Sequence, residues 1–122
     1  MINDLRDGER EEALRDVVEL RAPLRQAVDR LVSFGWDSDS ELVVFEPKDA
    51  VNVLQSYLSG GLDVAGVQLW AETLEGRDDL GFQAENGNIL KEFLFQLSSP
   101  EICGPISNEM ACRWRDSLRE FI

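Results

Sequence analysis

Apolar residues recur every three or four positions in short stretches of this chain, and Gly, Pro, Ser or Asp residues separate one stretch from the next. This spacing places the apolar side chains on one face of an α-helix. Helices with a single apolar face must pack against one another to bury it. We therefore predict an all-α fold of five or six short helices in a compact bundle or orthogonal array. The 122 residues are expected to form a single helical domain spanning residues 1–122.

The first helical stretch, about residues 9–34, contains Pro23. Proline lacks the backbone N–H that an interior helical position donates, but it suits the first turn of a helix. Either one helix is kinked at Pro23, or one helix ends near Leu20 and another begins with Pro23 in its first turn.

The later helices have start and stop signals of their own. Residues suited to the first helical turn or to the N-cap stand at Pro47, Asp63, Asn86 and Ser107. Residues that end helices stand at Gly60, Gly61, Gly76, Ser98, Ser99 and Pro100. Residues 42–45 form a short apolar run with β-branched members. Because a lone strand would have no partner, we predict an extended connection there.

Acidic residues are twice as frequent as basic residues, 24 against 12, and the net charge is −12. Residues 35–90 hold eleven acids and only two bases, Lys48 and Arg77, so this segment alone carries −9. Such a charge disfavours nucleic acid and anionic membrane as partners, because Lys and Arg neutralise their phosphates. It favours a basic protein partner. Alternatively, the acids are dispersed over loops and solvated helix faces.

The composition excludes several kinds of chemistry. The chain has no His, so Ser-His-Asp and Cys-His catalytic pairs and His-ligated zinc are impossible. Residues 37–48 begin like a calcium-binding EF-hand loop, but Leu42 replaces the required Gly and Lys48 the required Glu. We therefore expect no enzyme activity, no metal and no cofactor. Cys103 and Cys112 are expected to be free thiols, although a disulfide between them is geometrically possible.

The three tryptophans differ in their surroundings. Trp70 and Trp114 lie on apolar helix stripes and are predicted to be in the core. Trp36 lies in a polar loop and is the better candidate for exposure, as either a binding or a packing residue. Arg77 is nearly alone among acids, so we expect it to pair with Glu72, Glu75 or Asp78.

Several short motifs follow one another between about residues 50 and 120. They are Leu-Ser-Gly-Gly-Leu at 58–62, Trp70-Ala71 followed by Glu75 and Arg77-Asp78-Asp79, Leu-Ser-Ser-Pro-Glu-Ile at 97–102, and Gly104-Pro105-Ile106. This pattern resembles a group of small acidic bacterial proteins, mostly of unassigned function, some of which are similar to immunity proteins of toxin systems. The resemblance implies a protein that neutralises a basic toxin, often a nuclease.

The leading hypothesis is therefore a protein-binding module of immunity type, with an acidic face drawn from residues 35–90. Its expected contact residues are Trp36, Asp37, Asp39, Glu72, Glu75, Asp78 and Asp79. The alternative is a structural or regulatory helical module that acts through an apolar homodimer interface, so monomer and homodimer both remain open. The charged N-terminus and the lack of long apolar runs predict a cytoplasmic location, without secretion signal or membrane span.

Overall fold

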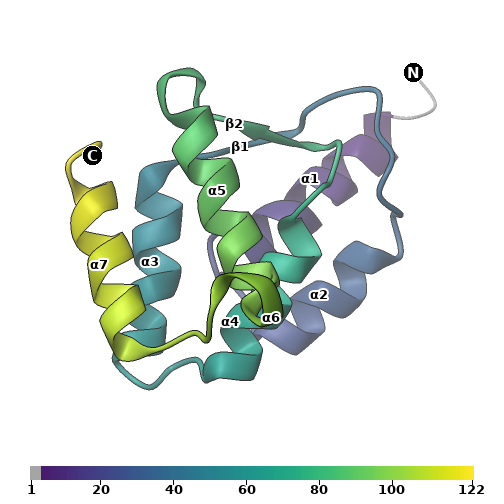
Figure 1. Ribbon diagram of the computed structural model, residues 1–122. Helices are drawn as coiled ribbons and strands as arrows, with labels where there is room; N and C mark the ends of the chain where they lie inside the picture. The colour runs from purple at the N-terminus through teal and green to yellow at the C-terminus, as the bar shows by residue number, and fades with distance from the viewer. Residues whose placement is uncertain (1–3) are drawn as a thin grey trace.

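The computed structural model describes residues 4–122 (Figure 1). The elements, in chain order, are α1 (Asp4–Val18), α2 (Leu24–Val32), β1 (Val43–Phe45), α3 (Pro47–Leu58), α4 (Val64–Leu74), β2 (Leu80–Phe82), the 3-10 helix η1 (Ala84–Asn86), α5 (Gly87–Ser98), α6 (Pro100–Cys103) and α7 (Asn108–Arg119). The described chain is mostly helical, as predicted. It has seven α-helices rather than five or six, because Pro100, which was predicted only to end a helix, also opens the single turn of α6.

The chain breaks between α1 and α2, which confirms the expected effect of Pro23. Helix α1 ends at Val18, and Pro23 stands directly before the first residue of α2 with φ of −53°. A helix can begin at this φ but cannot continue through the missing N–H. The two helices consequently fold back and pack against each other.

Two predicted N-caps are confirmed, and a third residue takes the position without the expected bond. The side chains of Asp63 and Ser107 accept hydrogen bonds from the backbone N–H three residues on, at 2.7 and 3.2 Å. Asn86 precedes α5 but makes no capping bond. Its side-chain amide donates to Gln83 instead.

The prediction that residues 42–45 form no strand is wrong. Val43–Phe45 pairs in parallel with Leu80–Phe82, in the register Val43 to Leu80 and Phe45 to Phe82. Helices α3 and α4 lie between the strands in sequence and provide the crossover that parallel pairing requires. The error arose because the partner is only three residues long and stands far along the chain.

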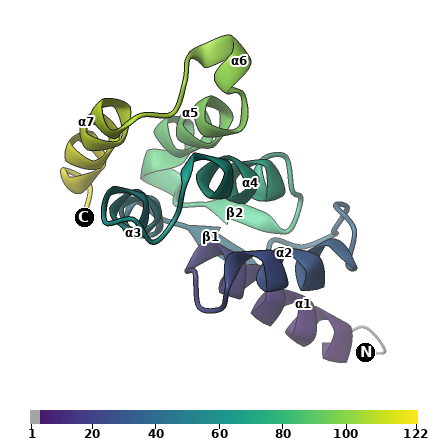
Figure 2. The ribbon, with the colours of Figure 1, turned by 90° about the horizontal axis from the view of Figure 1, so that it is seen from below.

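The helices are arranged around this small sheet in three neighbouring pairs. Helix α1 lies against α2, α3 against α7, and α4 against α5. Figures 1 and 2 show α7 and α3 on one side of the molecule, α1 and α2 on the other, and α4 and α5 between them. Within residues 4–122, no helix has the length and apolar character needed to cross a membrane.

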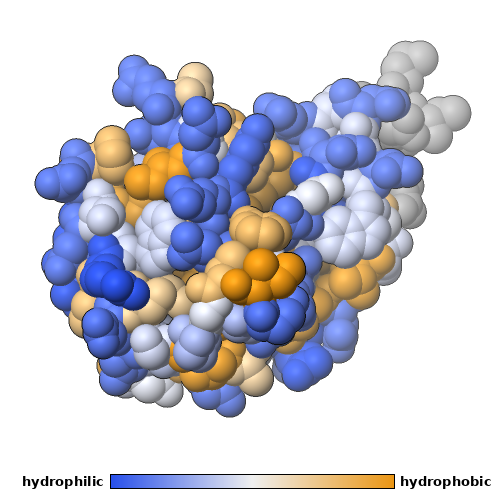
Figure 3. All heavy atoms as spheres, in the orientation of Figure 1, coloured by the Kyte–Doolittle hydropathy of each residue, from blue (hydrophilic) through white to orange (hydrophobic). Residues whose placement is uncertain are grey.

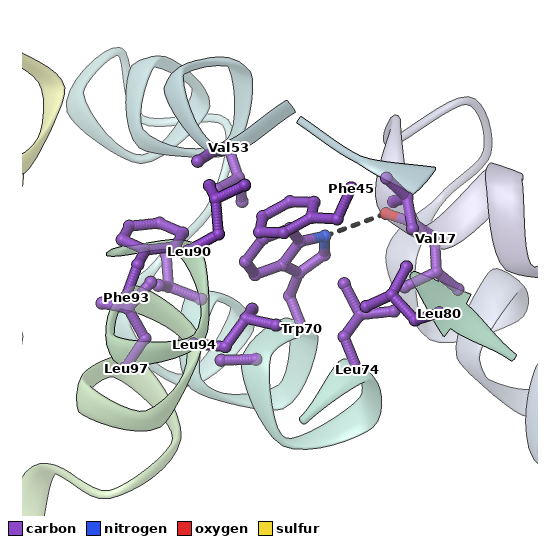
Figure 4. Close-up of a cluster of buried hydrophobic side chains, with 14 of the residues drawn as sticks. Val17, Phe45, Val53, Trp70, Leu74, Leu80, Leu90, Phe93, Leu94 and Leu97 are labelled. Atoms are coloured by element: carbon purple, nitrogen blue, oxygen red, sulfur yellow. Dashed lines mark hydrogen bonds between the residues drawn. The ribbon is translucent and has the colours of Figure 1, made fainter. Parts of the chain in front are cut away.

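An aromatic cluster built on Trp70 joins these layers. The ring of Trp70 is completely buried, with the rings of Phe45 and Phe93 centred 5.8 and 6.1 Å away. Its indole N–H donates to the carbonyl of Val17, at 2.9 Å, and so ties α4 to α1 (Figure 4). The prediction that Trp70 is a core residue is confirmed. Trp114 is only half-buried, because it packs against the outer side of Phe93.

Candidate functional site

The connection between α2 and β1 presents a tryptophan at the surface. Helix α2 ends at Val32, and Gly35 then turns the chain with φ of +74°. This is a left-handed conformation that residues other than glycine rarely adopt. Trp36 follows directly and is 48% exposed. We name residues 35–42 the Trp36 loop. An aromatic side chain this exposed retains a large area that a partner could cover.

One face of the Trp36 ring is supported by Arg77. The guanidinium carbon of Arg77 lies 5.3 Å from the centroid of the ring, within the range of a cation–π interaction. The Arg77 side chain is itself buried, with 1% exposure. The indole therefore packs against a buried charged group that is held in place by its own hydrogen bonds.

Arg77 belongs to a buried ion cluster centred on Asp79. The Asp79 carboxylate accepts hydrogen bonds from Nε and Nη2 of Arg77, at 2.9 and 3.1 Å, and from Nε of Arg10, at 2.7 Å. Burial by itself raises the pKa of Asp79, but the hydrogen bonds and positive charges of the two arginines outweigh it and lower the pKa below its ordinary value. The carboxylate consequently stays charged and bridges α1 to the start of β2.

The same arginines fasten the backbone of the Trp36 loop. Nη2 of Arg77 donates to the carbonyl of Gly35 at 2.6 Å, and Nη2 of Arg10 donates to the carbonyl of Asp37 at 2.8 Å. The carbonyl of Trp36 accepts a hydrogen bond from the backbone N–H of Asp78 at 3.2 Å. Three successive carbonyls are thus held from inside the protein. A loop ordered in this way loses little entropy when a partner binds.

Carboxylates surround the exposed side of the loop. A hollow of about 290 Å³ lies beside it, with Asp7, Asp37 and Asp39 among the residues that line it. Ser38 shapes the floor of this turn, because its hydroxyl donates to the carbonyl of Ser40 and accepts from the Ser40 N–H. Arg10 also borders the hollow, but its charge is opposed by Asp79. The net charge around Trp36 is therefore negative.

The structure brings together four of the seven residues expected to contact a partner. Trp36, Asp37 and Asp39 are exposed in the loop, and Asp78 is exposed beside it, because its N–H bonds the Trp36 carbonyl. These four residues form what we call the Trp36 surface. It unites a segment after α2 with a segment after α4.

The glutamates lie farther along α4. Glu72 is exposed on the helix and accepts a hydrogen bond from Gln68 at 3.1 Å. Glu75 is half-buried at the C-terminal end of α4, where it borders a hollow of about 200 Å³ together with Arg77 and Lys91. No contact given for the described residues joins Glu72 to the Trp36 loop.

Asp79 has a different place from the one predicted. Its side chain has no exposed surface, so it cannot belong to an exposed acidic face. The expectation that Arg77 pairs with Glu72, Glu75 or Asp78 is likewise wrong, because Arg77 bonds Asp79. Asp78 and Asp79 lie in the turn between α4 and β2, where the Asp79 side chain is buried and Asp78 stays exposed.

Sequence reasoning missed Arg10. It stands 69 positions before Asp79, and no local pattern links the two. The isolation of Arg77 among acids did indicate that it pairs within the protein. Within residues 4–122, no group of three or more thiol or carboxylate residues is arranged to hold a metal ion, and both cysteines are free.

Comparison of the chain with protein-family models, with curated proteins and with solved structures found no match. The resemblance to small acidic bacterial proteins therefore stays a prediction from the short motifs. Function has to be inferred from the side chains of the site themselves.

Proposed function

We propose that this chain is a protein-binding module that binds a basic protein through its Trp36 surface. The observation that carries the proposal is the half-exposed Trp36 ring, held from below by Arg77 and bordered by Asp37, Asp39 and Asp78. Tryptophan is enriched among the residues that dominate binding energy at protein interfaces. A fixed ring supports such a role, because little ordering remains to be done when the partner arrives.

The carboxylates give the surface its preference for a cationic partner. Opposite charges speed the encounter of two proteins and orient them before contact. The net charge of −9 on residues 35–90 extends this attraction beyond the contact itself. Glu72 on the last turn of α4 and Glu75, the residue that follows the helix, would add to the attracting field without contacting the centre of the partner.

A basic toxin is the specific partner that we propose. This step rests on the similarity of the sequence motifs to immunity-type proteins, and the charge of the Trp36 surface is in keeping with it. In this role the chain would cover the cationic substrate-binding surface of the toxin and so block it.

A capture experiment with matched charge variants tests the proposal. Three forms of the protein are immobilised and exposed to extract of the source cells at low salt: the unmodified chain, the double variant D37N/D39N, and the double variant E109Q/E120Q. Glu109 and Glu120 are exposed on or next to α7, on the side of the molecule away from the α2–β1 connection (Figures 1 and 2). Both variants remove two negative charges, so they differ only in the surface that is changed.

We expect a basic protein that is retained by the unmodified chain and by E109Q/E120Q, released by salt, and lost with D37N/D39N. The variant Trp36→Ala should lose the same protein, although it leaves the net charge unchanged. If all forms retain the same proteins, the binding depends on overall charge alone and the proposal is wrong.

A further inference from the structure

A groove between α5 and α7 lies outside the Trp36 surface and outside the function proposed above. Helix α7 packs on α3, and α5 packs on α4. Between α5 and α7 lies a hollow of about 420 Å³. The hollow is lined by Ile89, Glu92 and Gln96 from α5 and by Met110, Arg113 and Trp114 from α7. A second hollow, of about 270 Å³, shares three of these residues and continues the groove toward Pro105.

The floor of the groove is apolar and rigid. The ring of Trp114 stands edge-on against Phe93, with centroids 5.3 Å apart, and its indole N–H donates to Oε1 of Gln96 at 3.0 Å. Ile89 and Met110 are half-buried beside it. Figure 3 shows an orange and pale strip between α7 and α5, with blue, hydrophilic side chains on both sides. Covering this strip would remove apolar surface from water.

The charge of these helices differs from that of the rest of the chain. Together α5 and α7 carry four basic and three acidic residues, a net charge of +1, whereas the whole chain carries −12. The residues are Lys91, Arg113, Arg115, Arg119, Glu92, Glu109 and Asp116. Two copies of so acidic a protein repel one another most strongly through residues 35–90. A second copy can therefore approach the groove face with little repulsion.

The groove also carries opposite charges on its two walls. Glu92 on α5 and Arg113 on α7 are both exposed and line the same hollow, one from each wall of the groove. Neither forms an ion pair with another residue of the described chain. A two-fold axis running along the groove would set α7 of one copy opposite α5 of the other. Each Arg113 would then meet the Glu92 of the partner, twice in one interface.

We infer that the α5–α7 groove is the interface of a homodimer in which Trp114, Met110 and Ile89 are covered and Arg113 pairs with Glu92 across the two-fold axis. A groove with an acidic residue on one wall and a basic residue on the other is complemented by a second copy of itself. The α2–β1 connection, which carries Trp36, lies on the side of the molecule away from α7 (Figures 1 and 2), so we expect the dimer to leave the Trp36 surface of each copy open to a partner.

Sedimentation equilibrium with charge-reversed variants tests this inference. We expect the unmodified protein to dimerise, and Glu92→Arg or Arg113→Glu alone to weaken the dimer about tenfold or more, because each places like charges together twice. The double variant E92R/R113E restores both opposite-charge pairs and should recover the dimer. The control Arg25→Glu, an exposed residue of α2, changes charge as Arg113→Glu does and should leave dimerisation close to that of the unmodified protein.

Two results would overturn the inference. One is an unmodified protein that stays monomeric up to its highest soluble concentration. The other is a double variant that dimerises no better than the single variants, which would show that Glu92 and Arg113 do not meet. Because all substitutions are at exposed positions, circular dichroism should give the same helical content for each variant. The outcome is independent of whether the Trp36 surface binds a basic protein.

Discussion

Arg77 and Asp79 are joined by two hydrogen bonds inside the protein, although only one residue separates them in the chain. This pair does two things at once. Arg77 neutralises the carboxylate of Asp79, which has no access to water. Asp79 in turn holds the guanidinium of Arg77 under Trp36 and against the carbonyl of Gly35. The position of the Trp36 surface is therefore set by an interior ion cluster rather than by contacts among exposed residues.

Replacing Asp79 with asparagine should destabilise the protein by about 3 kcal/mol or more, because Arg77 and Arg10 would remain buried or half-buried without their anion. The free energy of unfolding in urea measures this change. Asp78→Asn is the matched control, since Asp78 is exposed, and it should alter stability by only about 0.5 kcal/mol. Equal effects of the two substitutions would mean that the Asp79 cluster does not stabilise the fold.

The pKa of Asp79 also predicts a sensitivity to acid. Because its pKa is lower in the folded protein than the ordinary value of about 3.9, the cluster contributes its full stability above that value. This contribution is lost as the pH falls through the lower, folded pKa. Unfolding free energies measured from pH 5 to pH 2 should therefore fall more steeply for the unmodified protein than for Asp79→Asn. Parallel curves would contradict the assignment.

Asp49 is expected to behave in the opposite way. It is only 7% exposed at the start of α3, where it accepts a hydrogen bond from the N–H of Glu46 at 3.0 Å. Burial outweighs this bond and raises the pKa of Asp49 to about 6. A raised pKa means that the folded state binds the proton more tightly, so this group lowers stability as pH rises from about 4 to 6.

Asp49→Asn keeps an oxygen that can accept the Glu46 bond and removes the charge. At pH 7 we expect this variant to be more stable than the unmodified protein by about 1–2 kcal/mol, with the advantage disappearing near pH 4. Thermal unfolding at the two pH values measures the difference. A variant that is less stable at pH 7 would show that the charged carboxylate is favoured by the helix N-terminus after all.

Arg77→Lys should loosen the Trp36 loop without unfolding the protein. Lysine keeps the positive charge, but it cannot donate in the forked geometry that binds Asp79 and Gly35 together. The amide of Asp78, which bonds the Trp36 carbonyl, should then exchange with solvent about tenfold faster. Hydrogen exchange followed by NMR gives this rate, and the amides of α5 serve as the internal reference. Unchanged protection of Asp78 would mean that Arg77 does not hold the loop.

The helices were predictable because their signals are local. Apolar spacing and the caps at Asp63 and Ser107 depend on residues within one or two helical turns, so a short stretch of sequence is enough to predict them. The strand at 43–45 was not predictable in this way. Its stability depends on Leu80–Phe82, which the crossover through α3 and α4 brings alongside. Pairing over such a separation leaves no periodic pattern in either segment.

In the candidate site, too, the features set by neighbouring residues were predictable and those set by distant residues were not. The exposure of Trp36 followed from its polar neighbours, and Asp37 and Asp39 necessarily lie near it in the chain. The inward turn of Asp79 and the participation of Arg10 depend on how α1 packs against the loop. Asp78 and Asp79 lie in a turn, and a turn has no alternation that would assign one carboxylate to the interior and the next to the surface.

We propose that the carboxylates of the Trp36 surface attract and orient a basic partner. The most direct test is the association rate constant with the captured protein, measured at increasing salt concentrations for the unmodified chain, D37N/D39N and E109Q/E120Q. We predict that salt slows the unmodified protein by about tenfold or more. D37N/D39N should associate more slowly at low salt and respond less to salt, while E109Q/E120Q should follow the unmodified protein closely. A rate that is independent of salt, or equally altered in both variants, would contradict the claim.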